Sequence, residues 1–143
     1  MKVIYVAGPY RACCEHEVYL NIHEAGELAR KVWLLGAVAI CPHKNTAFYG
    51  GNVDDRVWLD GDLEMIRRCD AMLMMPGWER STGAKAEREL AESLGQPVFE
   101  ELHELVKWLA QWNLATSTSS APSPSPEPSP TCTAAGGASC SGS

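Results

Sequence analysis

The chain has 143 residues and a mass of 15.6 kDa, which fits one domain, or one domain with a tail. Twelve Lys and Arg against 18 Asp and Glu give a net charge of -6. Proteins that coat nucleic acids are usually basic, so the composition excludes a nucleic-acid polymer as the main partner. No apolar run reaches the ~18 residues of a membrane helix. The N-terminal apolar run is interrupted at Gly8-Pro9, too early for a signal peptide, which predicts a cytoplasmic protein without membrane contact.

Apolar runs and helical periodicity alternate along the first 114 residues. The continuous apolar runs that predict buried strands lie at residues 3–7, 37–41, 71–75 and 98–99. The periodic segments that predict helices lie at residues 18–32, 55–69, 81–94 and 102–112. This alternation indicates an α/β fold, a three-layer doubly wound parallel sheet of the flavodoxin or Rossmann type with four or five strands. In such sheets ligands bind beyond the carboxyl ends of the strands, so the loops after strands one and three matter most.

The composition changes abruptly near Leu114. Residues 115–143 are rich in Ser, Pro, Thr, Ala and Gly and carry one charged residue, Glu127. No large apolar side chain is present to offset the entropy of ordering this segment. We therefore expect a folded domain over residues 1–114 and a disordered tail over residues 115–143, with a partner-binding Pro-rich motif as the alternative function of the tail.

The six cysteines indicate free thiols and not a disulfide framework. Without a secretory signal the compartment is reducing, and no C-x-x-C pair is present. Cys13 and Cys14 are adjacent, whereas Cys41 and Cys69 lie alone at the edges of apolar runs. We expect these thiols to behave as small hydrophobic side chains, and we expect no structural zinc site and no metal requirement.

Two loops carry residues suited to an anionic ligand. In the first, Gly8 allows the backbone to approach a ligand, and Arg11 can bind a phosphate or carboxylate through two hydrogen bonds. An ordinary turn with a solvated Arg explains the same residues. In the second, Ser81 and Gly83 open a helix whose free N–H groups attract anions, although Ser81 also serves as a simple N-cap. Neither loop contains a Walker motif or a G-x-G-x-x-G sequence.

Glu87 is the most informative carboxylate, because it lies on the inward face of the helix predicted over residues 81–94. Burial of an unpaired carboxylate is costly, so this position requires a reason. The functional interpretation is a nucleophile or general base, and the alternative is a structural ion pair with Arg11 or Arg88. Asp62, in the preceding helix, is a second candidate, since two carboxylates beside one sugar serve glycosidic chemistry. Without such a role Asp62 is solvated helix surface. His43 follows strand two and is either a ligand contact or structural.

Three segments of the sequence carry a family resemblance. They are residues 5–11, residues 62–64 with the later Asp70, and residues 81–87, which have the spacing Ser-x-Gly-x-x-x-Glu. Together they resemble the nucleoside 2-deoxyribosyltransferase-like superfamily, in particular its 2'-deoxynucleoside 5'-phosphate N-hydrolases. The sequence is also similar to small phage and bacterial proteins of uncharacterised function. The resemblance covers roughly residues 2 to 100.

The resemblance implies a role for each candidate residue. Glu87 would attack the anomeric carbon and form a glycosyl-enzyme intermediate, Asp62 would contact or protonate the leaving base, and Tyr5 would orient the Glu87 carboxylate. No metal or organic cofactor would be required. The residues expected to bind the substrate, including its 5'-phosphate, are Gly8, Pro9, Arg11, His43, Ser81 and Gly83.

The same resemblance leaves the acceptor open. Water would make the protein an N-glycosidase of a (deoxy)nucleoside 5'-monophosphate, whereas a second base would make it a deoxyribosyltransferase. Transferases of this superfamily complete the pocket with a neighbour's C-terminal residues, and the Ser-Pro tail therefore favours hydrolysis. Family members form dimers, so we expect a homodimer that acts on a small nucleoside or nucleotide. The competing hypotheses are a non-catalytic nucleotide sensor and an interaction protein whose tail recruits partners.

Overall fold

The fold is an open sheet of parallel strands in the order β2-β1-β3-β4, as shown by the computed structural model, which describes residues 1–117. In chain order the elements are β1 (Val3–Ala7), α1 (Glu15–Leu34), β2 (Val38–Ile40), α2 (Pro42–Asn45), α3 (Asp55–Arg67), β3 (Ala71–Met74), the 3-10 helix η1 (Trp78–Arg80), α4 (Thr82–Ser93), β4 (Val98–Phe99) and α5 (Leu102–Ser117). β1 pairs with β2 on one side and β3 on the other, with Tyr5 opposite both Ile40 and Met72. The strand order reverses between β1 and β3, so this boundary is the topological switch point of the sheet.

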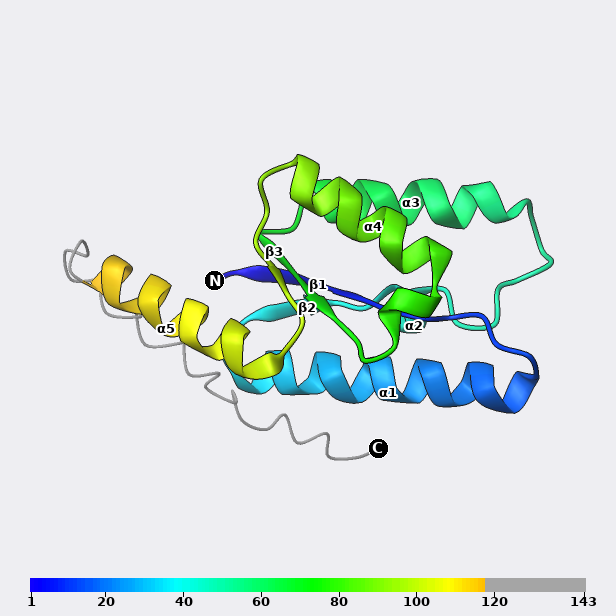
Figure 1. The fold of residues 1–143 in the computed structure, drawn as a ribbon, viewed down its shortest axis with the longest axis horizontal. Coiled ribbons are helices and arrows are strands. Elements are labelled where there is room, and N and C mark those ends of the chain that lie inside the picture. The colour runs from blue at the N-terminus through cyan, green and yellow to red at the C-terminus, as the bar shows by residue number, and fades with distance from the viewer. Residues whose placement is uncertain (118–143) are drawn as a thin grey trace, which may run out of the picture.

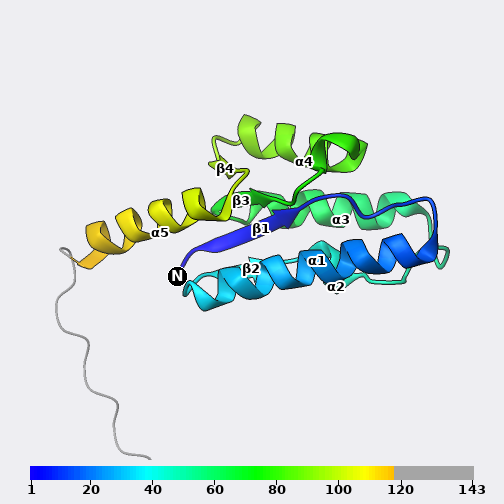
Figure 2. The same cartoon turned by 60° about the horizontal axis from the view of Figure 1, so that its bottom comes forward.

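Helices cover both faces of the sheet, which confirms the predicted three-layer architecture (Figure 1). The side chains of β1 alternate between the two faces, as they do in any strand. Ile4 and Val6 pack against α1, and Ile4 also against α5. Tyr5 and Ala7 face the opposite way and pack against α3 and α4. A second view shows α1 and α4 lying on opposite sides of the strands (Figure 2). Tyr5 therefore lies under the pair of helices that carries Asp62 and Glu87.

The predicted elements are all present, with shifts at their ends. The second strand is Val38–Ile40, shorter than the predicted residues 37–41, because Pro42 begins the short helix α2, which the sequence analysis did not predict. The third strand ends at Met74, although the Met75 N–H still donates a 2.7 Å hydrogen bond to the carbonyl of Ala7. The continuous apolar run over β3 reflects burial on both faces.

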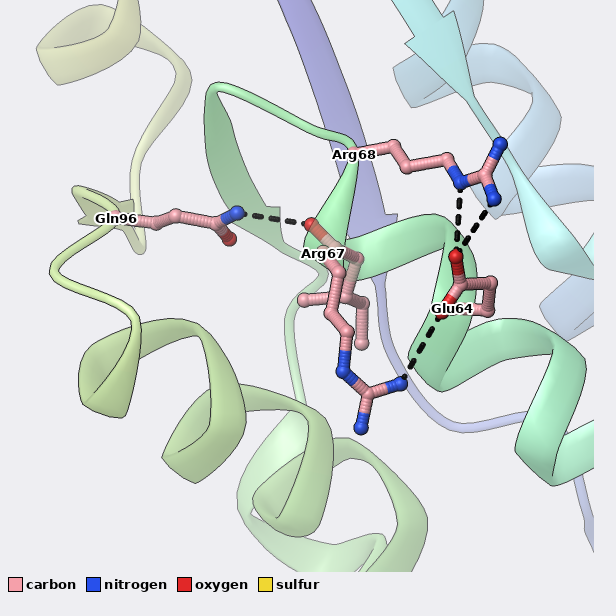
Figure 3. Close-up of polar contacts among 5 residues, drawn as sticks. Glu64, Arg67, Arg68 and Gln96 are labelled. Atoms are coloured by element: carbon pink, nitrogen blue, oxygen red, sulfur yellow. Dashed lines mark hydrogen bonds and ion pairs between the residues drawn. The ribbon is translucent and has the colours of Figure 1, made fainter.

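The C-terminal end of α3 is held by one amide side chain. Gln96 Nε2 donates a 2.8 Å hydrogen bond to the carbonyl of Ile66 (Figure 3) and a 2.7 Å hydrogen bond to the carbonyl of Cys69, just beyond the helix. The Ile66 carbonyl also accepts a 3.0 Å hydrogen bond from the Cys69 N–H, so the side chain reinforces the backbone at this helix end. Glu64 is exposed on α3 and pairs with Arg67 and Arg68 (Figure 3). The two acids of residues 62–64 therefore differ in their surroundings. Asp62 is partly buried, whereas Glu64 lies on the exposed surface of the helix.

α5 continues past Leu114, the predicted end of the folded domain, to Ser117. The remainder of the predicted tail, residues 118–143, lies outside the described residues. Within residues 1–117, no helix combines the length and the apolar character that crossing a membrane requires.

Gly8 is required by a close approach of two segments at the carboxyl end of the sheet. A Cβ added at Gly8 would lie 2.6 Å from the Met75 Cβ, inside van der Waals contact. We predict that Gly8→Ala lowers the free energy of unfolding by about 1–3 kcal/mol, because the β1–α1 loop and the end of β3 must move apart. Urea denaturation measures this change.

Gly61→Ala is the matched control for this substitution. Gly61 is exposed within α3, and no atom lies within 4 Å of the Cβ that alanine would add. Alanine should therefore raise the free energy of unfolding by about 1 kcal/mol through its higher helix propensity. Equal effects of the two substitutions would contradict the steric explanation for Gly8.

Candidate active site

The centre of the site is a hydrogen bond between a strand and a helix. Tyr5 is fully buried in the middle of β1, and its hydroxyl donates to Glu87 Oε1 at 2.8 Å. Glu87 is partly buried and lies on α4 between Ala84 and Ala91, which are buried on the same face of that helix. Residues at these spacings share one face of a helix, and this pattern turns the carboxyl group toward the sheet.

Asp62 joins this pair from α3. It precedes the buried Ile66 by one helical turn, so both side chains lie on the face of α3 directed at the sheet. Asp62 is partly buried, and its negative charge acts on both Tyr5 and Glu87. The structure therefore brings together the three residues that the resemblance assigned to catalysis.

Burial determines how these groups titrate. Loss of solvent raises the pKa of Glu87 to about 7, the hydrogen bond from Tyr5 opposes this rise, and the charge of Asp62 adds to it. Burial alone raises the pKa of Asp62 to about 6. The pKa of Tyr5 is raised by burial first and by the Glu87 charge second, so its hydroxyl stays protonated and remains a donor. Two carboxyl groups that change charge near neutral pH are suited to acid and base chemistry.

The structural alternative for Glu87, an ion pair with Arg11 or Arg88, is wrong. Arg88 bonds to Glu92 at 2.8 Å and to Glu100 at 2.6 Å, and its guanidinium lies over the ring of Trp78. Arg11 pairs with Asp55. Both arginines are therefore engaged elsewhere, and the hydrogen bond that holds Glu87 comes from a neutral phenol.

His43 is a buried link between α2 and the loop after β1. It is 4% exposed, its Nε2 donates to the Pro9 carbonyl at 3.1 Å, and its ring packs edge-on against Tyr10. Burial lowers the pKa of His43, which keeps the ring neutral. His43 Nδ1 is buried without a hydrogen-bond partner among the described residues. The arrangement fixes Gly8 and Pro9 in place and gives His43 a structural task.

Arg11 reaches across to the first residue of α3. Its ion pair with Asp55 joins the β1–α1 loop to α3, and both side chains are exposed. An exposed pair of this kind contributes at most about 1 kcal/mol, so an incoming anion can replace Asp55 at small cost. Sequence reasoning missed Asp55, because an acid in the first turn of a helix is common and carries no signal of a partner in another loop.

The start of α4 has the N-cap and the open backbone that the sequence predicts. Ser81 Oγ accepts a 3.2 Å hydrogen bond from the Ala84 N–H and caps the helix. A Cβ at Gly83 would lie 3.8 Å from Ser81 Oγ, an ordinary contact, so the packing of the chain does not itself require glycine there. The exposed backbone at Gly83 is open to a ligand at the helix N-terminus.

Two cavities of about 480 Å³ lie away from Tyr5, Asp62 and Glu87. One is formed by α1, β2 and α2, and the other is formed by the start of α1 and Phe48. Tyr5, Asp62 and Glu87 line neither of them. The catalytic candidates instead form a cluster between α3, α4 and β1, in which the residues Asp62 and Glu87 are each partly buried.

The strand order, with helices on both faces, is that of a doubly wound α/β fold, and the comparison with solved structures shows that it is nucleoside 2-deoxyribosyltransferase-like. A solved 2-deoxyribosyltransferase from the psychrotolerant bacterium Bacillus psychrosaccharolyticus is similar to the chain, with a TM-score of 0.50 and 25% sequence identity. The similarity covers 67% of this chain and 69% of that protein. It confirms the predicted fold class and the superfamily resemblance.

The chain belongs to the family described as a domain of unknown function, DUF4406, whose model matches residues 2–100. The matched segment runs from β1 to just beyond β4 and includes every residue named above as a candidate for catalysis or binding. The comparison with curated proteins found no match.

The raised pKa of Glu87 predicts a pH dependence of stability. The folded chain keeps the Glu87 proton up to about pH 7, whereas an unfolded chain releases it near 4.5, so stability falls as pH rises between these values. Glu87→Gln should reduce this fall by up to roughly 3 kcal/mol, measured by denaturant unfolding at several pH values. Glu89→Gln, an exposed change on the same helix, should leave the fall unchanged. Parallel curves for wild type and Glu87→Gln would show that Glu87 is not buried as described.

Proposed function

We propose that the protein is an N-glycosidase that cleaves the bond between base and sugar in a (deoxy)nucleoside 5'-monophosphate. The observation that carries the proposal is the 2.8 Å hydrogen bond from Tyr5 to Glu87, with Asp62 close to both. One carboxylate is held by a neutral donor, and a second acid lies beside it, which is the equipment for nucleophilic displacement at an anomeric carbon. The similarity to a solved 2-deoxyribosyltransferase supports a nucleoside as the substrate.

In the first step Glu87 Oε2, which is not bonded to Tyr5, attacks the anomeric carbon of the sugar. A bond forms between the carboxylate and the sugar, and the bond to the base nitrogen breaks. The electron pair of that bond goes to the base. Asp62 donates its proton to the base nitrogen, which its raised pKa permits near neutral pH. Tyr5 keeps the carboxylate oriented throughout, because its own proton is not released.

In the second step water attacks the same carbon and releases Glu87. The Asp62 carboxylate takes one proton from the water as it adds, which restores the initial protonation of the pair. The products are free base and sugar 5-phosphate. Negative charge on Glu87, and on Asp62 once it has given up its proton, also favours the positive character that develops on the sugar.

The 5'-phosphate is assigned to the start of α4. Ser81 and Gly83 offer a capped helix N-terminus with open backbone, and Arg11 can exchange Asp55 for the phosphate. Gly8 and Pro9 set the path of the intervening loop, and His43 holds that path through the Pro9 carbonyl. With the phosphate at the start of α4, the sugar would lie between that helix N-terminus and the carboxyl groups of Asp62 and Glu87.

Base exchange is the second candidate, and the similarity to a 2-deoxyribosyltransferase favours it. The first step would be identical, and a second base would replace water as the acceptor. The organisation that accompanies either reaction is a domain over residues 1–114 with a separate tail, in a cytoplasmic homodimer. The superfamily resemblance supports the dimer, and the change in composition near Leu114 supports the boundary.

The decisive test is release of free base from a panel of nucleosides and nucleoside monophosphates, detected by chromatography. We expect wild-type protein to release base and Glu87→Gln to lose this activity by at least ~10³-fold, because no carboxylate remains to attack the sugar. Glu89→Gln is the matched control and should retain activity. A second base in the reaction separates exchange from hydrolysis. Base release that survives Glu87→Gln would exclude Glu87 as the nucleophile.

The titration of the carboxyl pair predicts a bell-shaped pH profile. Glu87 must be ionised to attack, and its pKa is about 7, whereas Asp62 must be protonated to donate, and its pKa is about 6. We expect kcat/KM to peak between these values. The apparent pKa values of the two limbs describe the coupled pair and not either residue alone. Asp62→Asn should lower kcat/KM and remove the alkaline limb, and Asp60→Asn on the exposed face of α3 should change neither. An unaltered profile in Asp62→Asn would contradict its role as the acid.

A further inference from the structure

A second group of reactive side chains lies at the start of α1, outside the proposed active site. Cys13, Cys14 and Glu17 each offer one ligand atom, and these three atoms lie within 4.8 Å of one another. It is the one such group of potential metal ligands within residues 1–117. Cys13 Sγ donates a 3.4 Å hydrogen bond to Glu17 Oε2. All three side chains are exposed and open to an incoming ion.

The backbone explains why these groups meet. Cys14 is the residue that precedes α1, in an extended conformation with φ -147° and ψ 161°, so the two adjacent thiols lie on the approach to the helix. Glu17 lies in the first helical turn, four residues after Cys13 and three after Cys14. Cys13 lies outside the helix, and its thiol meets the Glu17 carboxylate where the chain turns into α1.

The distances suit tetrahedral coordination by two sulfurs and one oxygen. With metal bonds of ~2.3 Å to sulfur and ~2.1 Å to oxygen, neighbouring ligand atoms in a tetrahedron lie about 3.6–3.8 Å apart. The observed 3.4 Å between Cys13 Sγ and Glu17 Oε2 is close to this spacing, and the 4.8 Å limit on all pairs leaves only small rotations to be made. Two thiolates and a carboxylate are a donor set that borderline-soft divalent ions accept.

The surroundings provide room for a fourth ligand and a favourable charge. Both thiols line a cavity of about 480 Å³ whose other walls include Val18 and Phe48. Phe48 is held at φ 61°, a left-handed conformation that is costly for an aromatic residue, and its N–H donates to the Tyr10 hydroxyl. Glu15 adds a negative charge in the same helical turn. A cation bound to the thiols would thus face an open cavity and acidic neighbours.

We propose that Cys13, Cys14 and Glu17 form a surface binding site for a thiophilic divalent cation of the Zn²⁺ class, with the fourth coordination position open to water in the adjacent cavity. On binding, the two thiol groups release two protons to the solvent and form two metal–sulfur bonds, and the Glu17 carboxylate forms the third bond. Such a three-ligand site differs from the closed four-ligand structural zinc site that the sequence analysis excluded. The proposed nucleoside chemistry does not depend on it.

Co²⁺ is a suitable probe, because thiolate ligands and tetrahedral geometry each give it a distinct absorption spectrum. The titration uses the full chain, reduced, in a background with Cys132→Ser and Cys140→Ser to remove the thiols outside the described residues. Cys41 and Cys69 are buried and remain in place. We expect one Co²⁺ per chain, a thiolate-to-cobalt charge-transfer band, intense tetrahedral bands in the visible range, and displacement of the cobalt by Zn²⁺.

Single substitutions assign the ligands. Cys13→Ser and Cys14→Ser should each weaken the charge-transfer band and lower Co²⁺ affinity at least roughly tenfold, and Glu17→Gln should lower the affinity with the thiolate band retained. Glu15→Gln, in the same helical turn but outside the cluster, is the matched control and should bind as the background does. Absence of a tetrahedral spectrum, or binding that is unaffected by loss of either cysteine, would overturn the proposal. Circular dichroism confirms folding of each variant, and base release measured in parallel tests the proposed function separately.

Discussion

The candidate site depends on one constraint, a carboxyl group held against the middle strand of a parallel sheet by a phenol. Tyr5 has no access to solvent, so its hydroxyl needs an acceptor, and Glu87 provides it from a helix 82 residues further along the chain. The same bond keeps Glu87 at the boundary between core and solvent. There its pKa rises toward neutrality, and its second oxygen remains free to react.

The doubly wound topology places the other participants around this bond. The sheet reverses its order between β1 and β3, and the loops after these two strands lead to Arg11 and Ser81. Asp62 arrives from α3, on the same side of the sheet as α4. Cys13, Cys14 and Glu17 lie at the start of α1, the helix that packs on the opposite face of the sheet. A cation bound there would be separate from the carboxyl pair.

The parts of the fold that could be predicted were those with strong local signals. The sequence located β1, β3 and the helical face that carries Glu87 correctly. Burial on both faces and helical periodicity can be recognised from residues that are close together in the sequence. The short helix α2 was missed, since four residues contain too little periodicity to recognise. The alternative pairing of Glu87 with an arginine was wrong, because ion pairs such as Arg11 with Asp55 depend on segments that meet only after folding.

The sequence by itself determined the alternation of strands and helices, the inward position of Glu87 and the spacing of the superfamily motif, because each follows from periodicity within one element. Only the tertiary structure decided which groups surround that carboxylate. Tyr5, Asp62 and Glu87 come from three elements, and their contact exists because crossovers bring β1, α3 and α4 together on one face of the sheet. The cause is geometric: periodicity specifies a face of a helix or strand, whereas a partner on another element is specified by topology and packing.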